Sequence, residues 1–136
     1  MERIKVYIEW CNKNYAATVG KEVPGSVLVT DKTFEGIKKA VIDTVAFHIE
    51  GMLADGDDVP AWLASGDYEF EWVLSTSALL RSCERYTSIA SIARASGINE
   101  RLLSHYANGL KKPRPKQRER IVEGIHKIGR EFLSVV

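Results

Sequence analysis

The sequence predicts an α+β protein in two parts, a small β-β-β-α-β domain over residues 1–74 and an all-α domain over residues 75–136. Two observations support this division. Before residue 75, short runs of alternating apolar and polar residues surround one long segment in which apolar residues recur every three or four positions. From Ser75 onward only the three-to-four spacing remains, which is typical of helices packed on one another.

Three short strands are predicted at the start of the chain. Every second residue of Arg3–Glu9 is apolar, which is the period of a half-buried strand. Asn12-Lys13-Asn14 favours a turn, so Tyr15–Val19 is expected to return as an antiparallel strand. Pro24-Gly25 marks a bend, and Val27–Thr30 is predicted to be the third strand.

A long amphipathic helix is predicted next, with Thr33 as its N-cap and its end near Leu53. Its apolar stripe consists of Phe34, Ile37, Val41, Val45, Ile49 and Met52. A loop over residues 55–60 follows, because glycine and proline interrupt the helix there. The alternation in residues 68–74 predicts a fourth strand with an aromatic inner face (Tyr68, Phe70, Trp72) and two outward carboxylates (Glu69, Glu71).

The net charge of +1 conceals a strong asymmetry between the two parts. Residues 1–74 contain 7 Lys and Arg against 13 Asp and Glu, whereas residues 75–136 contain 12 against 5. The first part therefore carries −6 and the second +7. A basic part can neutralise phosphates of nucleic acid, and an acidic part suits a basic protein partner.

Several function classes are disfavoured by the sequence. Cys11 and Cys83 lie far apart without metal-binding spacing, no apolar run is long enough for a membrane span, and no signal-peptide pattern opens the chain, so we expect a cytoplasmic protein. His48, His105 and His126 are dispersed, which disfavours a metal site. One strand carboxylate, Glu9, and the loop acids Asp55, Asp57 and Asp58 do not suffice for a two-metal nuclease, so neither enzymatic activity nor a cofactor is expected.

The segment from Ile89 to Tyr106 predicts a helix-turn-helix. A close crossing of two helices needs a small residue in the first, here Ala93, and a residue that tolerates positive φ in the turn, here Gly97. Asn99 can cap the second helix. The angle between the helices is expected to be filled by Ile92, Ile98, Leu103 and Tyr106.

The second helix is predicted to enter the major groove of double-stranded DNA. Its outward residues, the candidates for contact with base edges, are Glu100, Arg101, Ser104, His105 and Asn108. A basic loop follows, in which Lys111, Lys112 and Arg114 are candidates for contact with phosphates. Pro115 suits the first turn of a last helix, which would bury Ile121, Ile125, Ile128 and Phe132, while Arg118 and Arg120 are expected on its solvated face.

These residues carry two family resemblances. The order Ile-Ala, Gly-Ile, Leu, Tyr and Asn-Gly, running into Lys-Lys-Pro, resembles the Cro/C1-repressor-like (Xre) helix-turn-helix proteins. The first domain resembles the HicB antitoxins in its opening strand pair, in Val23-Pro24-Gly25-Ser26, in the helix start Thr33–Ala40, and in Asp55-Gly56 with Val59-Pro60.

The HicB resemblance implies a partial RNase H-like first domain for toxin binding and dimerisation, and a homodimer or higher oligomer. It implies an antitoxin that neutralises a small, basic, RNA-cleaving toxin of the HicA type and represses its own operon by binding operator DNA. The residues that contact the toxin and the operator sequence stay open. The alternative is a stand-alone, ligand-responsive transcriptional repressor whose first domain senses a metabolite.

Overall fold

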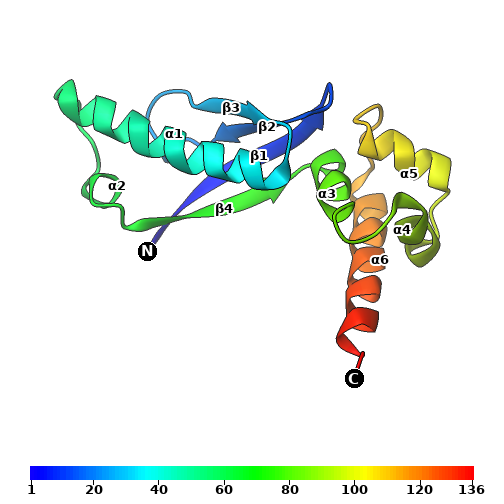
Figure 1. The fold of residues 1–136 in the computed structure, drawn as a ribbon. Coiled ribbons are helices and arrows are strands. Elements are labelled where there is room, and N and C mark those ends of the chain that lie inside the picture. The colour runs from blue at the N-terminus through cyan, green and yellow to red at the C-terminus, as the bar shows by residue number, and fades with distance from the viewer. The chain divides into compact units, whose positions relative to one another are not determined.

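The structure, a computed structural model, describes residues 1–136 and is an α+β fold with a four-stranded mixed sheet and six helices (Figure 1). The chain divides into two compact units, Met1–Ser75 and Thr76–Val136. The boundary predicted from the sequence follows residue 74, one residue earlier. None of the helices combines the length and the apolar character that a membrane span requires.

The sheet of the first unit has the strand order β3-β2-β1-β4. Its strands are β1 (Glu2–Cys11), β2 (Asn14–Val19), β3 (Leu28–Asp31) and β4 (Tyr68–Leu74). The first three form an antiparallel meander, and β4 runs parallel to β1. Asn12 and Lys13 both have positive φ, 51° and 65°, which suits the two-residue hairpin loop between β1 and β2.

Helix α1 (Phe34–Ala54) covers one face of this sheet (Figure 1). The Thr33 hydroxyl caps it by accepting a hydrogen bond of 3.0 Å from the Gly36 N–H, as predicted. All six residues of the predicted apolar stripe are buried, and Ile4, Val6 and Ile8 of β1 are fully buried. His48 is half-buried, with its Nε2 hydrogen bonded to the Pro24 carbonyl oxygen at 2.6 Å.

Two features of the first unit go beyond the prediction. Residues Ala61–Ala64 form a single helical turn, α2, which places Leu63 in the core. Such a turn is too short to produce a periodic pattern in the sequence. The predicted inner face of β4 is on the same side as the β1 core, since Phe70 pairs with Ile4 and Trp72 with Val6. Both aromatic side chains are nevertheless only half-buried.

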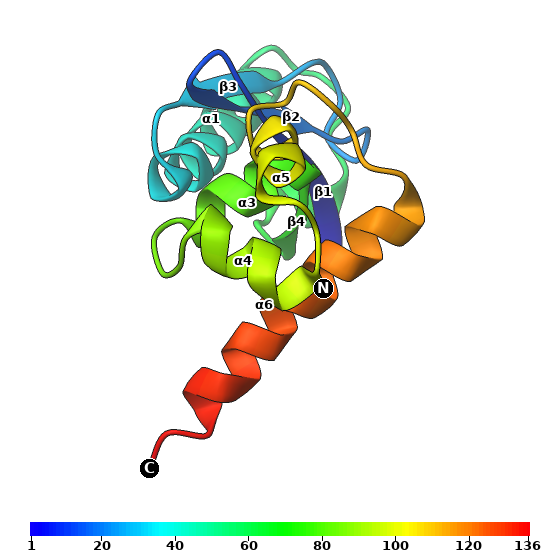
Figure 2. The same cartoon turned by 90° about the vertical axis from the view of Figure 1, so that its right-hand side faces the viewer.

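The second unit consists of helices α3 (Thr76–Cys83), α4 (Ile89–Ser96), α5 (Glu100–Ala107) and α6 (Pro115–Leu133). Pro115 begins α6, where its missing N–H costs no hydrogen bond. Figure 2 shows α4 and α5 joined by a short turn, with α6 running past them to the C-terminus. The core of the unit consists of Leu80, Ile92, Ala93, Ile98, Leu103, Tyr106, Ala107 and Ile121.

One part of the predicted α6 stripe is wrong. Ile121 is fully buried, and Ile125 and Ile128 pack partly against the core. Phe132 instead is 62% exposed. The reason is that α6 continues beyond the short helices it packs on, so its last turn has no partner within the unit.

Candidate nucleic-acid interface

The turn between α4 and α5 depends on a left-handed residue. Gly97 has φ 71° and ψ 19°, a conformation that costs a residue with a side chain about 1 kcal/mol or more. Its N–H donates to the Ala93 carbonyl at 2.9 Å, and the Ile98 N–H donates to the same oxygen at 3.2 Å. These bonds end α4 and turn the chain at once into α5. The predicted bend at Gly97 is confirmed.

Side-chain caps fix the starts of both helices. The Ser88 hydroxyl accepts from the Ser91 N–H at 3.0 Å at the start of α4. Asn99, the predicted cap, accepts at Oδ1 from the N–H groups of Arg101 and Leu102, at 2.9 and 3.3 Å. Each cap satisfies donors that a helix start otherwise leaves without partners.

The residues buried between α4 and α5 determine which face of α5 is exposed. The four residues predicted to fill the angle between the helices, Ile92, Ile98, Leu103 and Tyr106, are all buried. The polar residues of α5 recur every three or four positions, so they lie together on the opposite face of the helix. Glu100, Arg101 and Asn108 are exposed there, and Ser104 and His105 are half-exposed. Lys111, Lys112 and Arg114 are exposed in and after the following loop.

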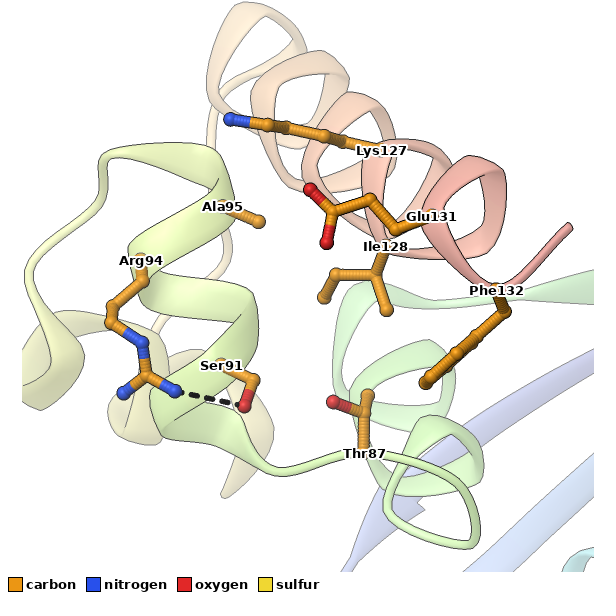
Figure 3. Close-up of a pocket in the computed structure, with 8 residues that line it drawn as sticks. All are labelled: Thr87, Ser91, Arg94, Ala95, Lys127, Ile128, Glu131 and Phe132. Atoms are coloured by element: carbon orange, nitrogen blue, oxygen red, sulfur yellow. Dashed lines mark hydrogen bonds between the residues drawn. The ribbon is translucent and has the colours of Figure 1, made fainter. Parts of the chain in front are cut away.

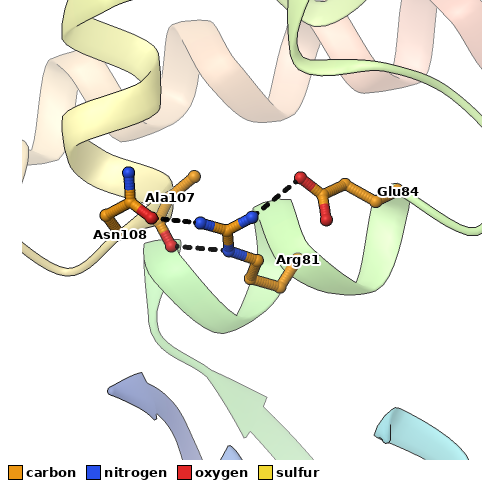
Figure 4. A network of polar contacts seen from close by, with 4 residues as sticks. All are labelled: Arg81, Glu84, Ala107 and Asn108. Atoms are coloured by element: carbon orange, nitrogen blue, oxygen red, sulfur yellow. Dashed lines mark hydrogen bonds and ion pairs between the residues drawn. The ribbon is translucent and has the colours of Figure 1, made fainter. Parts of the chain in front are cut away.

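The C-terminal end of α5 is held by Arg81, a residue that no pattern in the sequence marks (Figure 4). Arg81 of α3 donates from Nε to the Ala107 carbonyl at 3.0 Å, donates to Oδ1 of Asn108, and pairs with Glu84 at 3.0 Å. Its guanidinium therefore neutralises the negative end of the α5 dipole. Asn108, a predicted base-contacting residue, already has its acceptor engaged within the protein.

Helix α6 stabilises the turn between α4 and α5. Arg120 donates to the carbonyl oxygens of Gly97 at 3.0 Å and Ser96 at 3.4 Å. A Cβ added to Gly124 would lie 2.8 Å from the Cβ of Ser96, so α6 and α4 approach closely at this glycine. Arg118 donates to the Thr76 hydroxyl at 3.0 Å and is half-buried. The expectation that Arg118 lies on a solvated face is therefore wrong, because its long side chain reaches across to the start of α3.

The basic side chains of the second unit fall into two groups. One group is engaged by partners within the unit: Arg81, Arg85, Arg94, Arg118, Arg120 and Arg130. The other group forms no ion pair or side-chain hydrogen bond: Arg101, Lys111, Lys112, Arg114, Lys116 and Lys127. Five of these six lie between the first turn of α5 and the first turn of α6. The uncompensated positive charge is concentrated in one stretch of the chain.

A groove of about 360 Å³ lies between α4 and the C-terminal half of α6 (Figure 3). Its walls carry both signs of charge, with Arg94 on α4 and Lys127 and Glu131 on α6. Arg94 is turned back to the Ser91 hydroxyl at 3.1 Å, so it does not point across the groove. The groove is open and has no buried polar group that would select a ligand.

The titratable groups outside this region form no cluster of chemical interest. No three His, Cys, Asp or Glu side chains lie close enough together to hold a metal ion. Both cysteines are free thiols, Cys11 exposed and Cys83 half-buried. Burial raises the pKa of the Cys83 thiol above its ordinary value of 9.0, against the opposing effects of Ser82 and Arg85. The arginine at position 130 lowers the pKa of the exposed Glu123 carboxyl.

No protein-family model, no curated protein and no solved structure matches this chain.

Proposed function

We propose that the second unit is a helix-turn-helix that binds double-stranded operator DNA, and that the chain is an autorepressing antitoxin of the HicB type. The observation that carries the DNA-binding proposal is the concentration of unpaired basic side chains on and after the polar face of α5. Cations without a partner in the protein are free to displace counterions from phosphates, which is the main source of affinity for DNA.

In this proposal α5 lies in the major groove, and the residues of its first turn contact the base edges. Arg101 suits the paired acceptors on a guanine edge, and Glu100 suits the amino group of cytosine. Ser104 and His105 lie on the same face one turn further along. The loop from residue 109 to 114 would lie over the backbone, where Lys111, Lys112 and Arg114 contact phosphates. A homodimer would place two copies of α5 about one DNA turn, roughly 34 Å, apart.

The antitoxin part of the proposal rests on the first unit. It has the β-β-β-α-β order expected of a partial RNase H-like domain, with one additional helical turn before the last strand. Its charge of −6 repels DNA and favours a basic protein partner. RNA-cleaving toxins need a basic surface for their substrate, so an acidic domain can occupy that surface.

DNA binding is tested by mobility-shift titration on the DNA upstream of the chain's own gene. Replacing Arg101 by Ala should weaken binding by about 1–3 kcal/mol and relax the preference at one base pair. The matched control is Arg130→Ala, which removes an exposed arginine that already pairs with Glu123 on α6. Equal losses in both variants would contradict the proposed docking of α5.

Antitoxin activity is tested by expressing the reading frame adjacent to this gene, alone and with this chain. We expect growth arrest by the adjacent product alone, rescue by this chain, and co-purification of the two proteins. An adjacent product without toxicity would contradict the antitoxin proposal. A small molecule that abolished DNA binding would then favour the ligand-responsive repressor.

A further inference from the structure

The free edge of the sheet is formed by β4, and its backbone is available for pairing. β4 is the last strand in the order β3-β2-β1-β4 (Figure 1). The Glu2 N–H donates to the Asp67 carbonyl and the Ser75 N–H donates to the Ile8 carbonyl, so the odd-numbered residues of this segment bond toward β1. By alternation, the N–H and C=O groups of Tyr68, Phe70, Trp72 and Leu74 point to the open edge.

The backbone of β4 is regular along its whole length, without the interruptions that often prevent edge strands from pairing. β4 contains seven residues with no proline, no glycine and no bulge, and it pairs with β1 without interruption from Tyr68 to Leu74. Proteins commonly blunt such an edge with prolines, bulges or a very short strand. The opposite edge strand, β3, has only four residues. β4 is therefore the side of the sheet that can accept an additional strand.

An aromatic ladder runs beside this edge on the helix-covered face. The ring centroids of Trp62 and Tyr68 are 6.4 Å apart, those of Tyr68 and Phe70 are 5.6 Å apart, and those of Phe70 and Trp72 are 5.4 Å apart. Helix α1 packs mainly on β2 and β3, so it leaves the rings of β4 half-exposed. An added strand would cover these rings with its own apolar side chains.

The other face of β4 carries the charges that determine the partner. Glu69 and Glu71 lie there, opposite Arg3 and Lys5 of β1, and Arg3 pairs with Glu69 at 3.1 Å. If β4 paired over its full length with β4 of a second copy, Glu71 would face Glu71, and like charges directly opposite one another destabilise a sheet. A shift of the register toward the N-terminus would place Glu69 against Glu71. A shift toward the C-terminus would place Glu71 against Val73 instead. Because β4 contains no Lys or Arg, no register of two copies places a cation against Glu69 or Glu71, whereas a basic strand does.

We infer that β4 is the docking edge for an extended segment of a basic protein, in which Lys or Arg alternates with apolar residues. The cations would face Glu69 and Glu71, and the apolar residues would cover the aromatic ladder. Main-chain hydrogen bonds would supply affinity, and the alternating side chains would supply selectivity. Identifying this protein as the toxin rests on the proposed function.

The test measures binding of the full chain to the purified product of the adjacent reading frame by titration calorimetry. Glu71→Lys should weaken binding by about tenfold or more, because it places a cation against a cation. Its matched control is Glu9→Lys, which makes the same charge change on the same uncovered face of the sheet but on the central strand β1. Equal affinities for the wild type and Glu71→Lys would overturn the inference.

A second pair of variants tests the backbone contribution. Phe70→Pro removes an N–H that points to the open edge, and proline is tolerated at such edge positions. Phe70→Ala removes the same ring but keeps the N–H. We expect Phe70→Pro to bind more weakly than Phe70→Ala while both unfold in urea cooperatively. Equal binding by these two folded variants would show that no strand is added at β4.

A peptide titration separates failure of this inference from failure of the proposed function. If the adjacent product neither binds nor is toxic, the proposed function is wrong, and the edge is then tested with synthetic peptides. Alternating Lys-Val-Lys-Tyr-Lys-Val-Lys should shift the amide resonances of residues 68–74 in NMR spectra, whereas the same peptide with Glu in place of Lys should not. Shifts elsewhere, or none, would overturn the docking edge itself.

Discussion

At the scale of single residues, Arg120 links α6 to the turn on which the orientation of α5 depends. We predict that Arg120→Met lowers the free energy of unfolding by about 0.5–1.5 kcal/mol, because the Gly97 and Ser96 carbonyls lose their donor. Lys127→Met on the same helix is the control, since Lys127 has no such partner. Urea unfolding measures both variants. A loss no larger in Arg120→Met than in Lys127→Met would mean that water replaces the guanidinium without cost.

The thiol of Cys83 makes stability depend on alkaline pH. Because burial raises its pKa, the folded chain keeps the proton at pH values where the unfolded chain has lost it. This contribution to stability is fully present below the ordinary pKa of 9.0 and is lost as the pH rises through the folded value. We expect the free energy of unfolding of the wild type to fall more steeply there than that of Cys83→Ala. Parallel pH profiles would contradict this.

At the scale of elements, the crossing of α4 and α6 depends on Gly124. A methyl group at this position would meet the Cβ of Ser96 at 2.8 Å and its backbone nitrogen at 2.9 Å. We predict that Gly124→Ala destabilises the chain by about 1–3 kcal/mol, because the helices must move apart. Gly129→Ala on the same helix should instead stabilise it by up to about 1 kcal/mol, since nothing lies within 4 Å of the added carbon.

Thermal unfolding of the two glycine variants should therefore show shifts of opposite sign. Stabilisation by both substitutions would mean that α6 can move away from α4 without cost, and destabilisation by both would contradict the prediction for Gly129→Ala. The comparison separates the effect of the helix crossing from the general preference of helices for alanine over glycine.

The elements themselves were largely predictable, because their signals are local. Alternation in β1 and the stripe of α1 predicted these elements to within one or two residues of their ends. Gly97 and Asn99 marked the turn and the cap, since few residue types suit those positions. The half-buried aromatic face of β4 could not be predicted, because it depends on how far α1 extends across the sheet.

The arginines that stabilise the candidate site from other helices were not predictable from local patterns either. Arg81 and Arg120 each reach a carbonyl more than twenty residues away in the chain. A sequence shows such an arginine only as one more positive charge in a basic segment. Its role follows from tertiary packing, and the same packing distinguishes these engaged arginines from the unpaired Arg101.

At the scale of the whole molecule, the two units divide opposite charges between them, with −6 on the first and +7 on the second. A net charge of +1 would suggest little attraction to DNA. If only the second unit contacts DNA, the salt dependence of binding should be determined by the unpaired cations of that unit. The net charge of the whole chain should then not affect it. Local rather than total charge then determines which macromolecule each unit attracts.

A pair of lysine variants tests this division of charge. Lys112→Ala and Lys39→Ala each remove one exposed cation, the first from the basic loop and the second from α1. In mobility-shift titrations at several salt concentrations, Lys112→Ala should reduce the slope of log K against log salt by about 0.9, the value for one lost phosphate contact. Lys39→Ala should leave the slope unchanged, because α1 belongs to the acidic unit. Equal reductions would mean that DNA responds to the charge of the whole chain, and the separate roles of the two units would have to be abandoned.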